Sequence, residues 1–313
     1  MIRTLPRAAS DRPRLHAFGA RKSRLRRKEG RAGLLLAGPG ALHVLIWVGL
    51  PMVVALVLSF TRYDIPAPPE FIGVDNYVEA FTSRSFQRAV LNTLFLTIVA
   101  VPTAMIIALV IAVLLNQGMR WQGFFRTAVF LPHITATVAV AVLWLWIFNP
   151  DHTGLLNRII GTIGLGPVSW LGSTEWAMPS VIVMYIWQSI GIKMLIYLAA
   201  LQGLPPEVGE AARLDGANSL ERFWYMTVPL LRPATFFVLV ISVISSFQVF
   251  DQIYILTSGG PANATTVMTY QIYQSAFQAS RMGYASAQSI VLFVVLIILA
   301  IVSRRIVGGT DAH

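Results

Sequence analysis

The chain has 313 residues, of which 56% are hydrophobic and only 12% are charged, and its formal net charge is +10. Soluble proteins carry about 25% charged residues, so this composition argues against a soluble globular domain and indicates the lipid bilayer as the main solvent. The absence of cysteine excludes disulfides, thiol catalysis and cysteine metal sites.

Six long apolar segments follow one another along the chain. A helix needs roughly 20 mostly apolar residues to cross a hydrocarbon layer about 30 Å thick. The segments are too long and too continuously apolar for barrel strands, and lipid offers no partner to unpaired backbone groups. We therefore predict an all-α polytopic membrane protein with six transmembrane helices, at approximately 33–60, 89–116, 124–148, 176–202, 233–257 and 284–303.

The basic residues are distributed unevenly between these segments. Of the 24 Lys and Arg residues, 11 lie within residues 1–31 and seven more follow the second, fourth and sixth segments, whereas five lie in the other intervals. Since Lys and Arg near span ends remain on the cytoplasmic side, we predict that both termini are cytoplasmic. The same distribution argues against a nucleic-acid-binding protein. The basic arm is either a disordered topology signal or a helix that rests on anionic lipid.

Catalytic and nucleotide-binding motifs are missing from the sequence. The five histidines are scattered and form no HExxH pair, and none of the three lysines follows a glycine as GxxxxGK[ST] requires. We therefore expect no catalytic residue, no metal site and no cofactor bound by this chain. If ATP drives it, another subunit binds the ATP.

A polar and charged segment separates the fourth and fifth apolar segments. Pro205 and Pro206 end the preceding helix, and a short helix is predicted from Glu207, with acidic residues in its first turn. Gly216 permits a sharp turn, after which Ser219 is predicted to cap a second short helix. Charged and aromatic side chains exposed on such a unit favour a protein-docking surface.

This segment resembles the EAA loop of the membrane subunits of bacterial binding-protein-dependent ABC importers. Its Glu-Ala-Ala run is followed after three residues by Gly216 and after nine more by Met226, Val228 and Pro229, where Met and Val replace the usual Ile and Leu. FIGVDNY, FRTAVFLP, RFWYMTVPLLRP, LTSGGPANATT and GYASA also resemble the carbohydrate-uptake branch, notably the larger membrane subunit of the maltose importer and the related glycerol-phosphate and multiple-sugar permeases. The similarity covers residues 33–305.

The resemblance implies a type I ABC importer permease fold in the bacterial cytoplasmic (inner) membrane. It implies a basic cytoplasmic arm at 1–31, a six-helix permease domain at 32–306 with a coupling loop at 203–232, and a cytoplasmic tail at 307–313. The implied partners, besides membrane lipid, are a second homologous permease, an external solute-binding protein and two ATPase subunits that use ATP and magnesium. Transport would then proceed by alternating access, in which the two states differ in affinity for the partners.

In that family the loop inserts into a groove on the cytoplasmic ATPase and transmits its motion to the spans. Carried over to this sequence, Gly216 makes the turn, and Phe223 and Trp224 are packing anchors. The residues implied in coupling are Glu210, Ala211, Ala212, Arg213, Asp215, Gly216, Phe223, Trp224 and Pro229.

Polar residues inside apolar segments are costly and tend to face an interior, so they are the candidates for a substrate path. Ser242, Ser245 and Ser246 share one helical face by their spacing. Two sugar-contacting positions of the maltose-type subunit, which are polar in that subunit, correspond to Ile192 and Val249 in this sequence. These departures argue against the same disaccharide as substrate. Small hydroxyl residues also pack between helices, which is the alternative. The predicted path comprises Thr137, Gln188, Ser189, Ser242, Ser245, Ser246, Gln248 and Asp251.

Lys193 and Asp251 are the base and the acid placed well inside apolar segments. Each either has a structural partner, extends to an interface, or lines the pathway. A lysine in the pathway would suit an anionic substrate, so glycerol 3-phosphate or another sugar phosphate stays open beside a sugar or polyol. A stand-alone secondary transporter is a more distant alternative, because two isolated charges do not make a relay.

Overall fold

The computed structural model describes residues 36–118, 120–151, 153–214 and 216–307, and the chain divides into two units, residues 1–54 and 55–313. A helix of 23 residues, Leu36–Leu58, begins in the first unit and is long and apolar enough to cross a membrane. It contains the π-helical turn η1 (Leu45–Gly49) and α2 (Leu50–Leu58). The predicted basic arm and residues 308–313 of the predicted tail lie outside the described residues.

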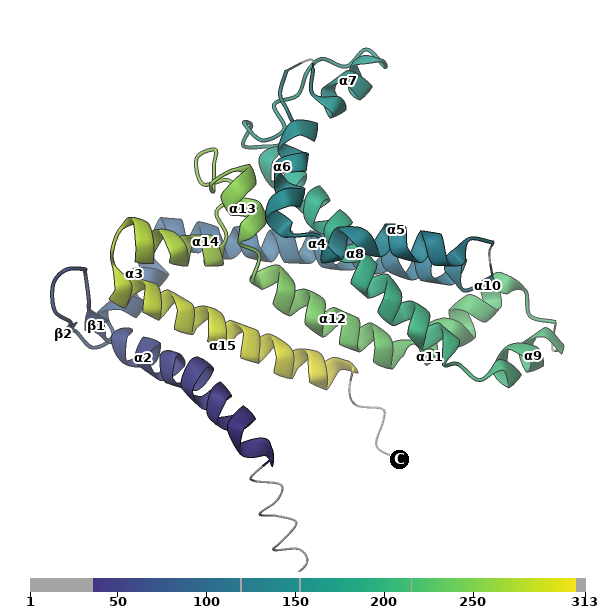
Figure 1. Ribbon diagram of the computed structural model, residues 1–313, viewed down its shortest axis with the longest axis horizontal. Coiled ribbons are helices and arrows are strands. Elements are labelled where there is room, and N and C mark those ends of the chain that lie inside the picture. The colour runs from purple at the N-terminus through teal and green to yellow at the C-terminus, as the bar shows by residue number, and fades with distance from the viewer. Residues whose placement is uncertain (1–35, 119, 152, 215, 308–313) are drawn as a thin grey trace, which may run out of the picture. The chain divides into compact units, whose positions relative to one another are not determined.

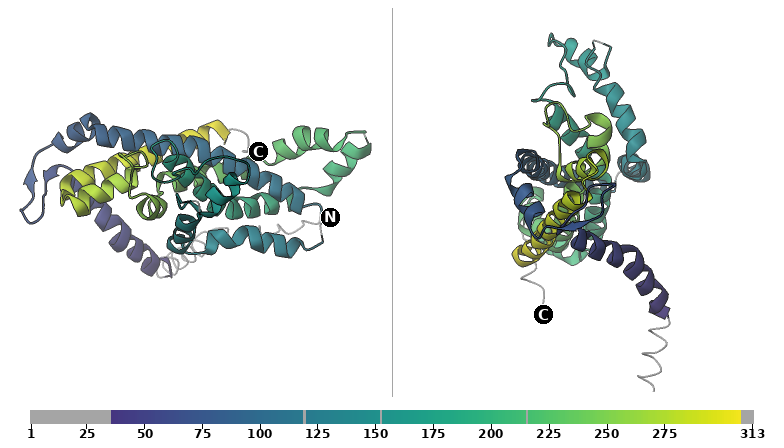
Figure 2. Two further views of the ribbon diagram at one scale, coloured as in Figure 1. Left: turned by 90° about the horizontal axis from the view of Figure 1, so that it is seen from above. Right: turned by 90° about the vertical axis from the view of Figure 1, so that its left-hand side faces the viewer.

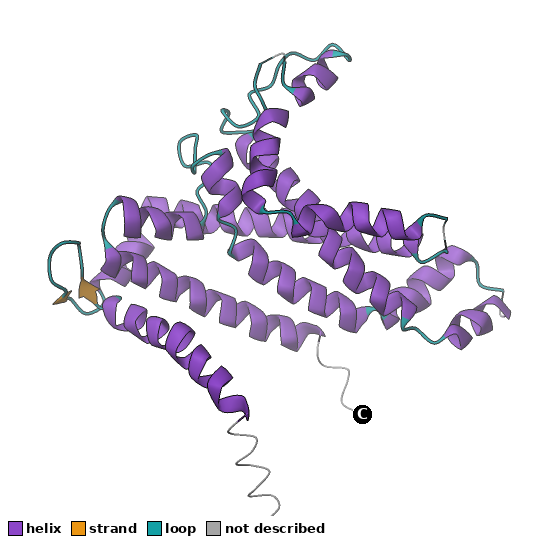
Figure 3. Ribbon diagram, viewed as in Figure 1, coloured by secondary structure: helices purple, strands orange, loops and turns teal. Residues whose placement is uncertain are grey.

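Helices dominate the described part of the second unit (Figure 3). Strands β1 (Thr61–Arg62) and β2 (Glu70–Phe71) pair antiparallel, with Thr61 opposite Phe71. The helices, in chain order, are α3 (Asp75–Thr82), α4 (Arg84–Leu115), α5 (Gln122–Ile134), α6 (Thr137–Ile147), α7 (Leu155–Gly161), α8 (Ala177–Gln202), α9 (Pro206–Leu214), α10 (Ser219–Arg222), η2 (Phe223–Thr227), α11 (Val228–Leu230), α12 (Arg232–Phe247), α13 (Asp251–Leu256), α14 (Met268–Tyr273), η3 (Gln274–Gln278) and α15 (Met282–Val307).

The prediction of an all-α membrane fold is confirmed. Four helices in the described residues are long and apolar enough to span a membrane, and the number rises to six if each of two bent helix pairs counts as one span. The first, second, fourth and sixth predicted spans correspond to Leu36–Leu58, Arg84–Leu115, Ala177–Gln202 and Met282–Ser303.

The third predicted span is not one straight helix. Its two parts, α5 and α6, are bent by 98° at Thr135, which has extended backbone angles, and Ala136, whose backbone is not helical. The carbonyl of Leu131 accepts from the backbone N–H of Thr135 at 3.2 Å and also from the Thr135 hydroxyl at 2.8 Å, so the last turn of α5 is closed twice. The bend brings His133 and Thr137, on either side of the break, to the same pocket.

The fifth predicted span is also interrupted. Helix α12 ends at Phe247, and the chain resumes helical structure only at Asp251, where α13 begins. The carbonyl of Val249 accepts a hydrogen bond from the hydroxyl of Thr269, which compensates for the helix bond lost at the break. At its other end, α12 is bent by 65° relative to the α10–α11 segment.

The most extensive helix pairing in the described part of the second unit joins α4 to α8 (Figures 1 and 2). Ala100, Ala104, Ala108 and Ala112 recur every fourth residue along α4 and are fully buried. Small side chains let helix backbones approach closely, and this is how helices associate where lipid removes the hydrophobic driving force. Two clusters of buried apolar residues pack along this pairing. One includes Val181 and Ile253, and the other includes Met194, Tyr197 and Leu231. These clusters hold α8 and α12, which supply much of the pocket described below.

An ion pair fastens α3 to the start of α15. Both guanidinium nitrogens of Arg281 donate to the carboxylate of Glu79 at 2.6 Å, and the guanidinium lies over the Tyr284 ring at 4.5 Å. The hydrogen bond from Arg281 holds the pKa of Glu79 below its usual value. Because the folded-state pKa is lowered, the stabilisation is present above the unfolded pKa and is lost as the pH falls through the folded one.

Replacing Glu79 with glutamine is expected to lower the free energy of unfolding at neutral pH by no more than about 1 kcal/mol, because the pair is partly exposed. The difference from wild type should vanish in acid, where wild-type Glu79 is protonated. Thermal unfolding of the purified protein over a pH series measures both effects. Glu70→Gln is the control, because Glu70 and Arg62 are 3.9 Å apart and more exposed. A pH-independent deficit, or the same deficit in the control, would contradict the assignment.

Candidate functional site

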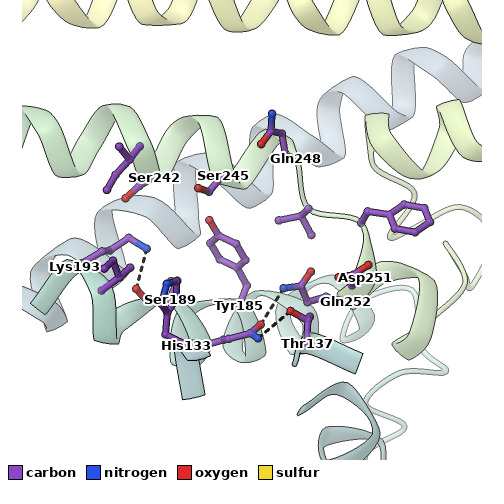
Figure 4. Close-up of a pocket in the computed structure, with 15 residues that line it drawn as sticks. His133, Thr137, Tyr185, Ser189, Lys193, Ser242, Ser245, Gln248, Asp251 and Gln252 are labelled. Carbon is purple, nitrogen blue, oxygen red and sulfur yellow. Dashed lines mark hydrogen bonds between the residues drawn. The ribbon is translucent and has the colours of Figure 1, made fainter. Parts of the chain in front are cut away.

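A cavity of about 340 Å³ lies where α5, α6, α8, α12 and α13 meet (Figure 4). Both helix breaks contribute to this cavity. His133 and Thr137 flank the break between α5 and α6, and Gln248 to Asp251 lie at the break between α12 and α13. Seven of the eight residues predicted for the substrate path line this cavity: Thr137, Gln188, Ser189, Ser242, Ser245, Gln248 and Asp251.

The eighth predicted residue, Ser246, does not line the cavity. Its hydroxyl is buried, lies 2.9 Å from the hydroxyl of Thr97 on α4 and donates to the carbonyl of Val243 at 2.8 Å. The described contacts of Ser246 are therefore those of helix packing, which is the alternative that the sequence left open.

A chain of side-chain amides fixes the wall formed by α6, α8 and α13. Gln252 donates to the Gln188 amide oxygen at 3.1 Å, and Gln188 in turn donates to the Thr137 hydroxyl at 3.1 Å. Gln188 and Gln252 are buried. Because each amide is oriented by its neighbour, the wall presents polar groups in defined directions rather than mobile ones.

Sequence reasoning missed His133, Tyr185 and Gln252, which also line the cavity. Tyr185 precedes Gln188 and Ser189 by three and four residues, so helical periodicity could have placed it on their face. Gln252 directly follows Asp251 in the chain. Pro132, which directly precedes His133, is a residue that can kink a span, although the apolar pattern continues through the bend.

Aromatic rings continue from the cavity along α13, α14 and η3. Phe250 lines the cavity and stacks on Tyr254, with ring centroids 5.5 Å apart and planes inclined by 20°. Tyr273 lies against both of these rings, and Phe277 lies 5.5 Å from Tyr273. Tyr254 and Phe277 are 44% and 69% exposed in the isolated chain. The cavity is therefore continuous with an accessible aromatic surface.

The loop between α8 and α12 forms two short helices joined by a tight turn, as predicted. Gly216 has φ +80°, which side chains rarely adopt, so glycine suits this turn. The second helix is capped by Asn218 rather than by Ser219. The side-chain oxygen of Asn218 accepts from the backbone amides of Leu220 and Glu221, and the Glu221 carboxylate accepts from the backbone amide of Asn218, which completes a capping box. The first helix starts at Pro206 rather than Glu207, because proline suits the first helical position.

The residues predicted for coupling are distributed over both helices of the loop. Glu210 is exposed, whereas Ala212 is fully buried. Trp224 is 58% exposed, and its ring meets that of Phe223 edge-on, with the ring centroids 5.2 Å apart. Pro229 lies in α11. Asp215 and the side chains of Ala211 and Arg213 lie outside the described residues. A second cavity of about 280 Å³ separates this loop from the end of α8, and its lining includes Leu201, Val208, Met226 and Leu230.

Residues 77–309 match the family model of the binding-protein-dependent transport system inner membrane component. The match covers most of the chain, including every residue of the cavity and of the loop. The chain belongs to this family. The permease is therefore a multi-pass protein of the bacterial inner membrane and a transport subunit rather than an enzyme, as the sequence predicted.

Individual proteins agree with the family. The permease is 36% identical to the probable ABC transporter permease YurN of Bacillus subtilis over 85% of its length and 92% of the relative. It is 31% identical to the arabinooligosaccharides transport system permease AraP of Bacillus subtilis, over 89% of each chain.

Two solved structures of a bacterial alginate ABC transporter share the fold of the permease. One is described as importing the acidic polysaccharide alginate and has a TM-score of 0.78 at 29% identity, covering 92% of this chain and all of that one. The other, in complex with an alginate pentasaccharide-bound periplasmic protein, has a TM-score of 0.80 at 28% identity, covering 93% and 99%. The expected type I permease fold is thus confirmed.

Proposed function

We propose that the permease pairs with a second, homologous permease to form the path of an ABC importer for a sugar or polyol, which an external solute-binding protein delivers. Two separate ATPase subunits would hydrolyse ATP with magnesium. The observation that carries this proposal is the cavity at the two helix breaks, with its fixed polar wall and adjoining aromatic rings.

The chemistry of this cavity suits saccharides. Amides and hydroxyls such as Gln188, Ser189 and Ser245 exchange hydrogen bonds with sugar hydroxyls, while rings such as Phe250 pack on the apolar face of a sugar. The relative named for arabinooligosaccharides and the structures of the alginate importer support a carbohydrate substrate. Alginate is described as acidic, so the substrate class includes acidic as well as neutral saccharides.

The connectivity of the loop supports a role in coupling. It joins the end of α8 to the start of α12, and both of these helices line the cavity. A displacement of the loop by an ATPase would therefore act on two walls of the cavity at once. Alternating access then requires that the ATPase binds one arrangement of the loop more tightly than the other.

The proposed topology places the loop on the cytoplasmic side, together with the basic arm at 1–31 and the tail at 307–313. The basic arm holds 11 Lys and Arg residues, the loop holds Arg213, Arg222 and Arg232, and Arg304 and Arg305 directly precede the tail, which supports that placement. The segment 32–306 would form the permease domain.

The proposal is tested by purifying the tagged permease from its native membrane in mild detergent and identifying its partners by mass spectrometry. An ATPase with a P-loop, a second permease and a binding protein are expected with the wild type. Gly216→Pro should abolish recovery of the ATPase, because proline fixes φ near −65° and cannot adopt the φ of +80° found here.

Gly203→Ala is the matched control, since a Cβ at Gly203 would meet neighbouring atoms only at an ordinary distance of 3.6 Å. It should leave the ATPase associated. A permease that purifies alone while it remains folded and active in transport would overturn the proposal.

A further inference from the structure

One end of the cavity holds a buried lysine without an acidic partner. Lys193 is only 3% exposed, and its ammonium donates to the carbonyl of Ser189 at 3.2 Å. Within the residues that the structure describes, no carboxylate lies within 4.0 Å of it. An ammonium has three N–H donors, so two remain for another acceptor.

Two hydroxyls beside this lysine also have no partner. The hydroxyls of Tyr185 and Ser242 are buried and make no hydrogen bond to any described residue. Figure 4 shows Lys193 and Ser242 at one end of the cavity, with the Tyr185 hydroxyl directed into it and Asp251 at the opposite end. The ammonium lies over the Tyr185 ring, 5.8 Å from its centroid.

These three groups favour a ligand that supplies acceptors. An ammonium is a donor with no acceptor capacity, and each hydroxyl adds a donor. Burying an unpaired charge is expensive, whereas a charge that is paired and hydrogen-bonded is tolerated. A neutral sugar hydroxyl would leave the charge uncompensated, but an anionic group would neutralise it and accept from all three donors.

We propose that Lys193, Tyr185 and Ser242 form an anion subsite that binds the carboxylate, sulfonate or phosphate group of an acidic saccharide. This inference rests on the proposed function, because it names the substrate class of the same cavity. Asp251, at the far end, would face the neutral hydroxyls of such a saccharide, and its own charge disfavours an anion there. The cavity therefore orients the substrate as well as selecting it.

The test uses the permease assembled with its co-purified partners in proteoliposomes, with the binding protein outside. Uptake of digalacturonate is compared with that of neutral galactobiose, and uptake of glucose 6-phosphate with that of glucose. Because every variant receives the same binding protein, a change in the charged-to-neutral ratio reports on the permease. The charged probe that is taken up distinguishes a carboxylate substrate from a phosphate substrate.

Lys193→Met is expected to lower the charged-to-neutral ratio about tenfold or more, and Lys193→Arg to retain most of it. Tyr185→Phe and Ser242→Ala should lower the ratio by smaller factors. These two changes remove one hydroxyl each with little change in shape, so they carry the test if Lys193→Met does not assemble.

Equal losses of charged and neutral uptake in all three donor variants would overturn the inference. Wild-type uptake of neutral probes alone would overturn it as well, while the proposed sugar importer stands.

Discussion

Replacing Gly191 with alanine is expected to lower transport by the permease at least about tenfold and its unfolding free energy by about 1–3 kcal/mol. A Cβ at this position would lie 2.6 Å from the carbonyl oxygen of Val129 and 2.8 Å from Cα of Phe130. Both are backbone atoms of α5, so the helix itself must move away from α8. That shift displaces the break after α5, and with it Thr137, from its partner Gln188.

The expected loss opposes the intrinsic preference of helices, since alanine favours a helix interior by about 1 kcal/mol over glycine. Gly123→Ala, near the start of α5, is the control, because no atom lies within 4 Å of the added Cβ. It should transport normally. Thermal unfolding of the purified complex and substrate uptake in proteoliposomes measure both variants. Equal behaviour of the two would show that close approach of α5 and α8 is not required.

The long spans could be predicted because each is a sustained apolar run with clear ends. The fourth, for example, was expected at 176–202 and is found at Ala177–Gln202. Length and hydropathy suffice for such segments, because any helix that crosses lipid must satisfy its backbone internally. The turn in the loop between α8 and α12 could also be predicted, since glycine readily adopts the positive φ found at Gly216.

The two helix breaks could not be predicted in the same way. Hydropathy continues through Thr135 and through Val249, and each break depends on a hydrogen bond that periodicity does not reveal. The partner of the Val249 carbonyl is Thr269, which lies 20 residues later in the chain. A contact distant in the chain therefore accompanies the second break, whereas the bond at the first is local, and the two interruptions build the cavity.

Residue type indicated most of the cavity but not which way each side chain faces. The spacing placed Ser242, Ser245 and Ser246 on one face, yet packing against Thr97 of α4 turns Ser246 away while Ser242 and Ser245 stay at the cavity. A face of a helix is broad, and the neighbouring helix determines which of its residues reach the cavity. Whether each residue contacts substrate stays a prediction.

Asn157 holds together the segment that follows α6. Its side chain is buried, and its amide nitrogen donates to the carbonyls of Asn149, Pro150 and Val168 at 3.2, 2.8 and 3.0 Å. Its oxygen accepts from the Val168 amide at 3.0 Å and from the Trp170 indole at 2.8 Å. One residue therefore joins both sides of the connection between α6 and α8, and any apolar or acidic replacement leaves several buried groups without a partner.

Asn157→Asp is expected to release this connection, because a carboxylate keeps the acceptor but turns a negative oxygen toward three carbonyl oxygens. The local cost should reach about 2 kcal/mol or more, so amide hydrogen exchange across residues 153–171 should speed up more than about tenfold while α8 is unchanged. Asn263→Asp is the matched control. The described side-chain hydrogen bond of Asn263 is one that its amide oxygen accepts from the Thr266 hydroxyl at 3.3 Å, and an aspartate oxygen can accept the same bond. Unchanged exchange in Asn157→Asp would show that other contacts hold the segment. Faster exchange in both variants would trace the effect to added negative charge rather than to the lost donors.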